Sequence, residues 1–312
     1  MAGRDIDLVW DACDRLVWDR HMAACDRSSL EQSWAYGEAV AASSRRSVRR
    51  ALALCDGRPL ALVQVFEAGR GRPLTLGQVT RGPLWLGPLG AERRLAVCRA
   101  LKQAYRLRQH RLLLWMPELP DDADSEALMR RCGLRRMVTG YSTLWLDLDR
   151  PEDELRRGLR GQWRNALAAA EAGGLTLRTG IAAGQLDWLL DEHDRFRRRA
   201  RFLGPSGAFI RALAAAAPDS LVVICAYAGE RPLAGILAVT HGRSATYYLG
   251  FTTPEGRRAR AHNLLLWNAV LALKARAIDW LDLGGVDGRT PGVARFKLGL
   301  GGALCTLSGT YL

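Results

Sequence analysis

The chain has 312 residues and a net charge of +13, and 48% of its residues are hydrophobic and 25% charged. This composition allows buried cores and excludes an intrinsically disordered protein. No apolar run reaches the roughly 18 residues of a transmembrane helix, and the first residues lack the basic-then-apolar order of a signal peptide. We therefore expect a cytoplasmic protein with two domains of roughly 150 residues each.

The seven cysteines and five histidines lie apart, without CxxC or HExxH spacing. This pattern predicts reduced thiols, no metal site and no bound cofactor. The positive charge is spread over both halves of the chain, which predicts a polyanionic partner such as nucleic acid, nucleotide phosphate or an anionic membrane surface. A basic surface that serves only solubility is the alternative interpretation.

The first half of the chain contains a strand–helix–strand pattern. Residues 60–66 alternate like a strand, as do parts of 74–86. Residues 91–109 have the apolar stripe of a helix, and residues 111–115 are typical of a buried strand. Pro117 ends that strand.

The second half repeats this order. A strand pair is predicted at residues 221–228 and 233–240, and a further strand at 245–250. An apolar helix at 262–277 and a strand at 278–283 follow. Matched element order predicts an internal repeat of two α/β domains, each a mixed sheet flanked by helices.

One helix is predicted between the two halves, beginning after Pro151 and ending at Gly173. It has two stripes of four-residue spacing, an apolar one and a basic one of Arg156, Arg160 and Arg164. The arginines are interpreted either as a solvated face or as ligands of phosphate groups in a substrate or in tRNA.

Seven short motifs resemble the FemABX family of aminoacyltransferases, which form peptidoglycan bridges and have tandem GNAT-like domains. In chain order, the motifs are Gln32 to Trp34, Thr80 to Pro83, Ala170 to Gly174, Leu233 to Ile236, Thr246 to Gly250, Asp282 to Gly285 and Phe296 to Gly301. They extend over almost the whole chain in the order of the family.

The resemblance implies two GNAT-like domains with different tasks. Residues 1–149, joined by a C-terminal strand at about 303–312, correspond to the acceptor side. Residues 150–302 correspond to the donor side and contain a Phe-Lys loop. The stretch 187–218 is too short for the long helical hairpin of some members, so the chain resembles the armless type. The implied donor is an aminoacyl-tRNA, and the implied acceptor is a peptidoglycan precursor stem peptide.

The resemblance also assigns candidate site residues. Lys297 corresponds to a catalytic cation that stabilises an oxyanion, and Phe296 packs beside it. Asp282 is expected to orient the loop 284–295 rather than to move protons, and Asp287 is not expected to be catalytic.

Six further residues are assigned to substrate binding. The set comprises Arg160, Arg164, Tyr247, Tyr248, Trp34 and Arg81. Because Tyr247 and Tyr248 alternate on a strand, one faces the core and the other a cleft. Glu38 stands where some members have a phosphate-binding lysine, which puts a nucleotide-sugar acceptor in doubt.

Three other functions remain open. A GNAT-type acyltransferase would use acyl-CoA, but such enzymes need a glycine-rich phosphate loop, and Gly256 to His262 has no internal glycine. A tRNA-dependent enzyme acting on a natural-product scaffold is the second alternative. A non-enzymatic RNA- or membrane-binding protein is the third, although RNA-recognition motifs are absent.

Overall fold

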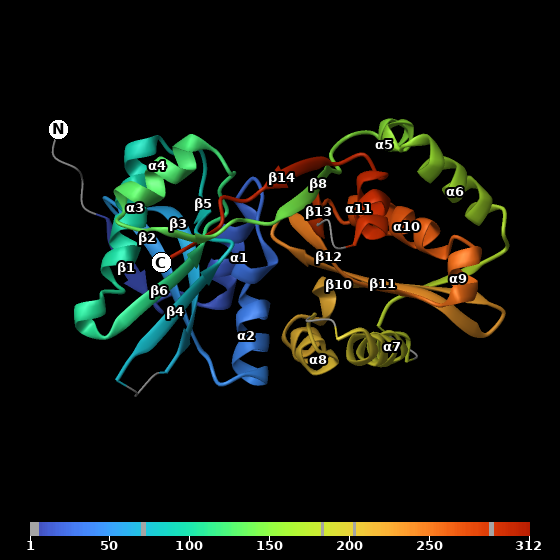
Figure 1. The fold of residues 1–312 in the computed structure, drawn as a ribbon, viewed down its shortest axis with the longest axis horizontal. Helices are drawn as coiled ribbons and strands as arrows, with labels where there is room; N and C mark the ends of the chain where they lie inside the picture. The colour runs from blue at the N-terminus through green and yellow to red at the C-terminus, as the bar shows by residue number, and fades with distance from the viewer. Residues whose placement is uncertain (1–5, 70–72, 182–183, 202–203, 287–289) are drawn as a thin grey trace. The chain divides into compact units, whose positions relative to one another are not determined.

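The computed structural model describes residues 6–69, 73–181, 184–201, 204–286 and 290–312. The chain folds into two compact units (Figure 1). Unit 1 comprises residues 1–142, 241–243 and 305–312, and unit 2 comprises 143–240 and 244–304. Residues 143–149, expected in the first domain, belong to unit 2 because Leu144, Leu146 and Leu148 are part of its core.

Unit 1 is built on a mixed sheet in the order β1-β2-β3-β4-β6-β15-β7, with β5 paired to β3. Strands β1 to β4 pair antiparallel, β4 and β6 pair parallel, and β15 is antiparallel to β6 and β7. The strand bounds are β1 Asp7–Trp10, β2 Ser47–Cys55, β3 Arg58–Ala68, β4 Thr75–Thr80, β5 Leu84–Trp85, β6 Arg111–Met116, β7 Arg136–Val138 and β15 Thr310–Tyr311.

Helices cover both faces of this sheet. On β3, Leu62 contacts the cluster that contains Trp18 of α1, whereas Val63 belongs to the cluster that contains Leu95 of α3. Successive strand residues point to opposite faces, so α1 and α3 lie on opposite sides. The helix bounds are α1 Arg15–Ala23, α2 Trp34–Ser43, α3 Ala91–Gln103 and α4 Ala123–Arg131, with 3-10 turns η1 Leu30–Gln32 and η2 Leu107–Gln109.

The helix predicted over 91–109 is shorter in the structure, since α3 ends at Gln103. Tyr105 follows the helix, is buried in the core and donates its hydroxyl to Glu67 at 2.8 Å. A long-range contact thus ends the helix earlier than its local pattern predicts.

Unit 2 has a second mixed sheet in the order β14-β8-β13-β12-β11-β10-β9. The central strands β12 and β13 are parallel, and their pairing runs from Ser244↔Trp280 to Thr246↔Asp282. The strand bounds are β8 Ser142–Asp147, β9 Thr176–Thr179, β10 Leu221–Ala228, β11 Arg231–His241, β12 Ser244–Thr252, β13 Trp280–Val286 and β14 Ala303–Thr306.

Helices α6 and α10 pack on one face of this sheet, and α7 packs on the other (Figure 1). On β11, Ile236 joins the core with α6 and α10, whereas Gly235 faces Trp188 and Leu189 of α7. The helix bounds are α5 Glu152–Gly158, α6 Gly161–Glu171, α7 Gln185–Ala200, α8 Gly207–Ala216, α9 Pro254–Arg258, α10 Ala261–Ala275 and α11 Pro291–Leu298, with a 3-10 turn η3 Pro218–Ser220.

The prediction of a single helix between the two halves is wrong. The segment forms α5 and α6, because Leu159 adopts φ −61° and ψ 135° between them. The break lies between Gly158 and Gly161, and glycine is a poor helix former. The three-arginine stripe is therefore divided, and Arg156 on α5 ion-pairs with Glu171 at 2.6 Å.

The predicted fold class is confirmed, since each unit is a mixed sheet flanked by helices. The described part of the stretch 187–218 contains most of α7, all of α8 and the first residue of η3, and α7 and α8 contact each other. Within the described ranges, no helix combines the length and apolarity needed to cross a membrane.

Candidate active site in the second unit

Lys297 lies on helix α11 and not on a loop as expected. Only 8% of its surface is exposed, and its Nζ donates to the carbonyl oxygen of Gly285 at 2.8 Å. A buried ammonium needs polar partners to offset the loss of its hydration. Its position is therefore defined by the backbone of β13 and is not that of a surface lysine.

The turn that holds Lys297 is organised by Asp282. This fully buried carboxylate accepts from the backbone N–H of Gly284 at 2.8 Å and from the hydroxyl of Thr143. Gly284 has φ +70°, a conformation that favours glycine. Asp282 thus orients the backbone that leads to Gly285. Asp287 lies outside the described residues.

Aromatic rings lie beside Lys297 and its neighbour Phe296. The ring centroid of Phe296 lies 5.9 Å from that of Trp163 on α6 and 5.4 Å from that of His262 on α10. The ring centroid of Tyr247 on β12 lies 5.9 Å from Lys297 Nζ. Helix α11 and strand β12 of the same unit therefore bring Phe296, Lys297 and Tyr247 together. Tyr248 is the next residue on β12, so its side chain leaves the opposite face of the strand.

His262, on α10, is not among the site residues predicted from the sequence. Its Nε2 lies 2.7 Å from the hydroxyl oxygen of Tyr247. A Cβ atom on Gly250 would overlap the Tyr247 hydroxyl and approach the His262 ring to 2.7 Å, so this pair requires glycine at position 250. The only signal in the sequence was the Tyr-x-x-Gly motif itself, which predicts a close approach at the glycine without naming the partner.

Burial keeps this pair uncharged. Desolvation lowers the pKa of His262 to about 4 and raises the pKa of Tyr247 above its ordinary value. Both side chains are therefore neutral near pH 7. His262 Nδ1 is inaccessible to solvent and has no hydrogen-bond partner.

Arg160 and Arg164 flank this cluster from α6. The backbone N–H of Arg160 donates to the carbonyl oxygen of Gly299 at 3.0 Å, which joins the start of α6 to the end of α11. Both side chains are exposed. They lie at the positive end of the α6 dipole, beside Trp163, and this arrangement favours anions.

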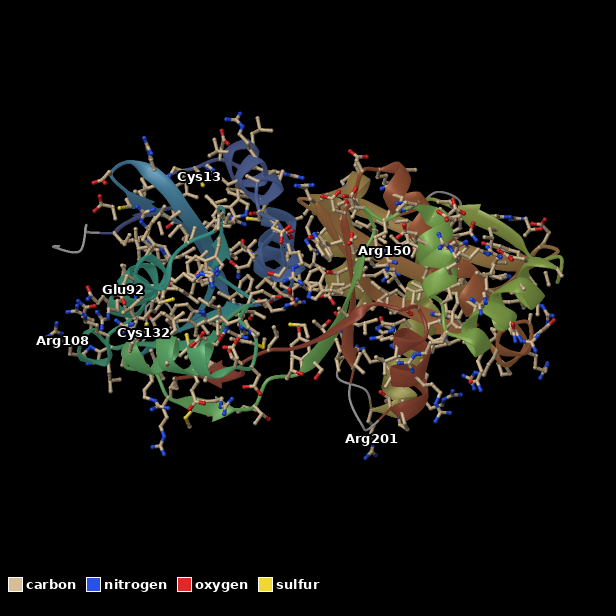
Figure 2. All side chains as sticks on the ribbon, turned by 90° about the horizontal axis from the view of Figure 1, so that it is seen from above. Cys13, Glu92, Arg108, Cys132, Arg150 and Arg201 are labelled. Atoms are coloured by element: carbon tan, nitrogen blue, oxygen red, sulfur yellow. The ribbon has the colours of Figure 1, made fainter. Side chains whose placement is uncertain are left out.

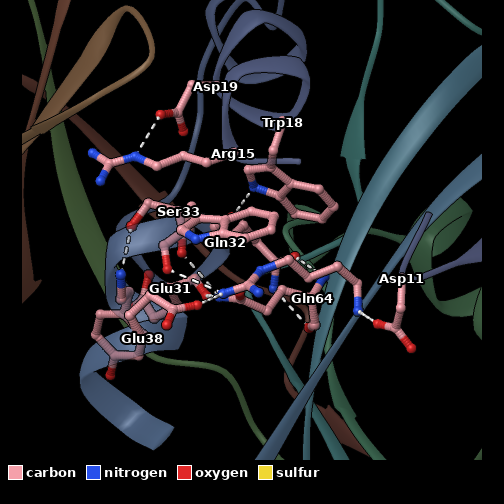
Figure 3. Close-up of polar contacts among 12 residues, drawn as sticks. Asp11, Arg15, Trp18, Asp19, Glu31, Gln32, Ser33, Glu38 and Gln64 are labelled. Atoms are coloured by element: carbon pink, nitrogen blue, oxygen red, sulfur yellow. Dashed lines mark hydrogen bonds and ion pairs between the residues drawn. The ribbon is translucent and has the colours of Figure 1, made fainter. Parts of the chain in front are cut away.

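The other predicted binding residues lie in unit 1, where Trp34 is the first residue of α2. The guanidinium carbon of Arg50 lies 3.6 Å from the centroid of the Trp34 ring. Arg50 also donates to Gln64 at 2.8 Å and to the half-exposed Glu38 at 2.9 Å (Figure 3). Glu38 is therefore part of an ion pair that holds Arg50 over Trp34.

Arg81 is almost fully buried, with 2% of its side-chain surface exposed. Its guanidinium donates two hydrogen bonds to Glu118, at 2.6 and 2.7 Å, and its carbonyl accepts from Ser29 at 2.6 Å. This bidentate pair engages the guanidinium within unit 1, so Arg81 is better explained as a structural residue than as a substrate ligand.

All seven cysteines are free thiols. In the part of the chain that the structure describes, no group of three or more His, Cys, Asp or Glu side chains is arranged to hold a metal ion.

Residues 154–298 match the model of the acetyltransferase (GNAT) domain. The crystal structure of FemX is similar with a TM-score of 0.81 and 14% identity, over 97% of this chain and 96% of that chain. This chain has a FemX-type fold. The resemblance to the FemABX family is thereby confirmed at the level of the fold.

Two further solved structures are similar to this chain. L-PGS from Bacillus licheniformis has a TM-score of 0.58 and 12% identity, over 96% of this chain and 91% of that chain. A tandem GNAT protein from the clavulanic acid biosynthesis pathway has a TM-score of 0.55 and 15% identity, over 98% of both chains. The tandem GNAT-like architecture is confirmed by these likenesses. No curated protein matches the sequence.

Proposed function

We propose that this protein is an aminoacyl-tRNA-dependent aminoacyltransferase that forms an amide bond on an amine acceptor such as a peptidoglycan precursor stem peptide. The observation that carries the proposal is the buried Lys297, whose Nζ donates to the Gly285 carbonyl and lies 5.9 Å from the centroid of the Tyr247 ring. The acyltransferase class follows from the GNAT domain and the FemX-type fold.

The reaction needs a cation at the place where negative charge develops. The acceptor amine attacks the carbonyl carbon of the aminoacyl ester, and the carbonyl oxygen becomes an oxyanion. A fixed ammonium that is already desolvated stabilises this charge without reorganising. Lys297 fits that role because it is buried and the Gly285 carbonyl fixes its Nζ.

The identities of the structural neighbours support an aminoacyl donor. One neighbour is FemX, and another is the C-terminal domain of a putative lysylphosphatidylglycerol synthetase from Agrobacterium fabrum, with a TM-score of 0.58. The exposed arginines at the start of α6 provide cations for tRNA phosphates near the site. Peripheral contact with an anionic membrane would bring the enzyme to a lipid-linked acceptor, and the net charge of +13 favours this.

The deciding experiment is a donor screen. The protein is incubated with each radiolabelled aminoacyl-tRNA and an amine acceptor, and label that becomes stable to mild alkali is counted, because an ester is cleaved and an amide is not. We expect stable label from one or a few amino acids. Peptidoglycan precursors and unrelated amines as separate acceptors then distinguish a cell-wall substrate from a natural-product scaffold. No stable label from any donor contradicts the proposal.

An acyl-CoA-dependent N-acyltransferase is the second candidate, because the matched family model is an acetyltransferase domain. Such a site presents free backbone amides at a helix N-terminus to a pyrophosphate. Here the short helix α9 lies just before α10. Gly256 belongs to α9, is buried beside the carbonyl oxygen of Leu233, and donates its backbone N–H to the Thr253 hydroxyl. Turnover of acetyl-CoA in the absence of tRNA would favour this candidate over the aminoacyl donor.

A further inference from the structure

Two cysteines of unit 1 lie where helices α3 and α4 meet. Cys98 lies within α3 and is followed by Arg99, and Cys132 caps the C-terminus of α4 and is preceded by Arg131. The Arg99 guanidinium donates to the Arg131 carbonyl oxygen at 3.3 Å. The Arg131 side chain pairs with Glu92 of α3 at 3.0 Å (Figure 2 labels Glu92 and Cys132). The end of α4 therefore contacts α3 at positions before and after Cys98.

The two thiols meet in the core of unit 1. Both side chains belong to the cluster that contains Leu95, Leu101 and Met129. The Cys98 thiol donates a hydrogen bond to the sulfur of Cys132. A disulfide forms without backbone movement only where two cysteine side chains are close and point toward each other. This pair meets that condition in the reduced protein, in which both thiols are free.

The two cysteines differ in access and in acidity. Cys98 is 1% exposed, whereas Cys132 is 8% exposed and is followed by the exposed Gly133, so it lies just under the surface at a helix end. The hydrogen bond from Cys98 lowers the pKa of Cys132, and the nearby Arg99 and Arg131 lower it further, while burial opposes them. A lowered pKa and neighbouring cations are typical of reactive cysteines, because the thiolate is the nucleophile.

We propose that Cys132 and Cys98 form an oxidation site, at which a peroxide converts the two thiols into one reversible disulfide. The Cys132 thiolate attacks a peroxide oxygen, the O–O bond breaks, and the sulfur is oxidised to a sulfenic acid. The Cys98 sulfur then displaces hydroxide from that sulfur and forms the S–S bond. With hydrogen peroxide, the two thiol protons leave in two molecules of water. Two electrons pass from the thiols to the peroxide, and a thiol reductant reverses the change.

The disulfide constrains the centre of unit 1. The loop that it closes contains the whole of β6, which lies between β4 and β15 in the sheet. A cross-link on both sides of this strand restricts the unfolded chain and so stabilises the folded unit. Lys297 belongs to unit 2, and the oxidation site does not depend on the proposed transferase activity.

The test is a hydrogen peroxide titration of the reduced, full-length protein. After oxidation, the remaining thiols are alkylated and the chain is digested without reductant. We expect a linked pair of peptides that contains Cys98 and Cys132, loss of two of the seven thiols, and recovery of all seven with dithiothreitol. The melting temperature should rise by at least about 5 °C on oxidation and return on reduction, because the cross-link restricts the unfolded state.

Two variants test the order of the steps. Cys98→Ser should stop at a sulfenic acid on Cys132, which dimedone traps. Cys132→Ser should keep its Cys98 thiol at peroxide concentrations that oxidise the unaltered protein. Cys225→Ser is the matched control, since this buried cysteine lies on β10 of unit 2. It should form the Cys98–Cys132 disulfide as readily as the unaltered protein.

The peptide map of the unaltered protein decides the proposal even where a variant does not fold. Intact Cys98 and Cys132 thiols after the other cysteines have been oxidised overturn it. A Cys98–Cys132 link that appears only after denaturation also overturns it, because the site would then not be assembled in the folded chain. Dimedone on Cys98 instead of Cys132 contradicts the assigned order of attack. None of these measurements needs an aminoacyl donor, so they leave the proposed function to its own experiment.

Discussion

Lys297 differs from the other two lysines in what its ammonium contacts. Lys274 donates to the carbonyls of Leu148 and Arg150 and so ties α10 to the chain before α5. Lys102 lies half-buried on α3 in unit 1. The Lys297 ammonium lies 5.9 Å from the ring centroid of Tyr247, whose hydroxyl contacts His262. We expect Lys297→Ala to lower the rate of aminoacyl transfer at least about tenfold, since loss of one oxyanion donor can cost 10²–10³-fold.

Lys297→Arg should restore only part of that rate, because a planar guanidinium does not replace a compact ammonium in a closed site. Single-turnover rates with saturating aminoacyl-tRNA measure both effects. Lys102→Ala is the control and should leave the rate unchanged. Unaltered transfer by Lys297→Ala would show that Lys297 is not the catalytic cation.

Gly250 carries a second prediction at the same scale. An added Cβ would overlap the Tyr247 hydroxyl and push it away from His262. We expect Gly250→Ala to lower transfer about tenfold or more while the melting temperature changes little, because position 250 is exposed. Gly90→Ala is the control, since its Cβ would meet no atom within 4 Å. A fully active Gly250→Ala variant would separate the pair from catalysis.

At the scale of elements, the break between α5 and α6 decides which arginines lie near the site. Arg156 is turned to Glu171, while Arg160 starts α6 and Arg164 lies one turn further. The start of α6 is also where Trp163 contacts Phe296. A helix N-terminus with two exposed cations thus lies beside the candidate site, as the proposed binding of a tRNA phosphate would require.

We expect the double charge reversal Arg160→Glu and Arg164→Glu to raise KM for aminoacyl-tRNA at least about tenfold with a smaller effect on kcat, because phosphate contacts mainly position the nucleic acid. Steady-state kinetics over a series of aminoacyl-tRNA concentrations measures the effects on KM and on kcat separately. The control reverses two exposed arginines of unit 1, Arg93 and Arg108 (Figure 2 labels Arg108). Equal losses in both double variants would argue against a local phosphate site on α6.

At the scale of the whole molecule, local patterns predicted the elements, while contacts between distant residues decided the site. Period-two alternation in β3 and the apolar helix α10 are local, and both were recognised in the sequence. The Tyr247–His262 pair joins two different elements, and the Arg81–Glu118 pair joins residues 37 positions apart. No spacing rule connects such partners. The same limit explains why Arg81 was assigned to substrate binding and His262 was missed.

The net charge of +13 supports a last prediction for the complete chain. Five arginines lie at or just after the end of α7, and Arg195 and Arg197 ion-pair with Glu192 and Asp194. The other three, Arg198, Arg199 and Arg201, are exposed (Figure 2 labels Arg201). Exposed cations of this kind bind phosphates by releasing counterions.

Affinity for tRNA should therefore fall steeply with salt. If about four phosphates are contacted, the affinity drops about 100-fold between 50 and 200 mM salt. Filter binding over a salt series measures the slope, and uncharged tRNA is sufficient because the phosphates dominate. A small amine acceptor provides the comparison, since its KM should change much less over the same range. A tRNA affinity that is independent of salt would mean that the basic surface serves solubility and that the donor is recognised by other contacts.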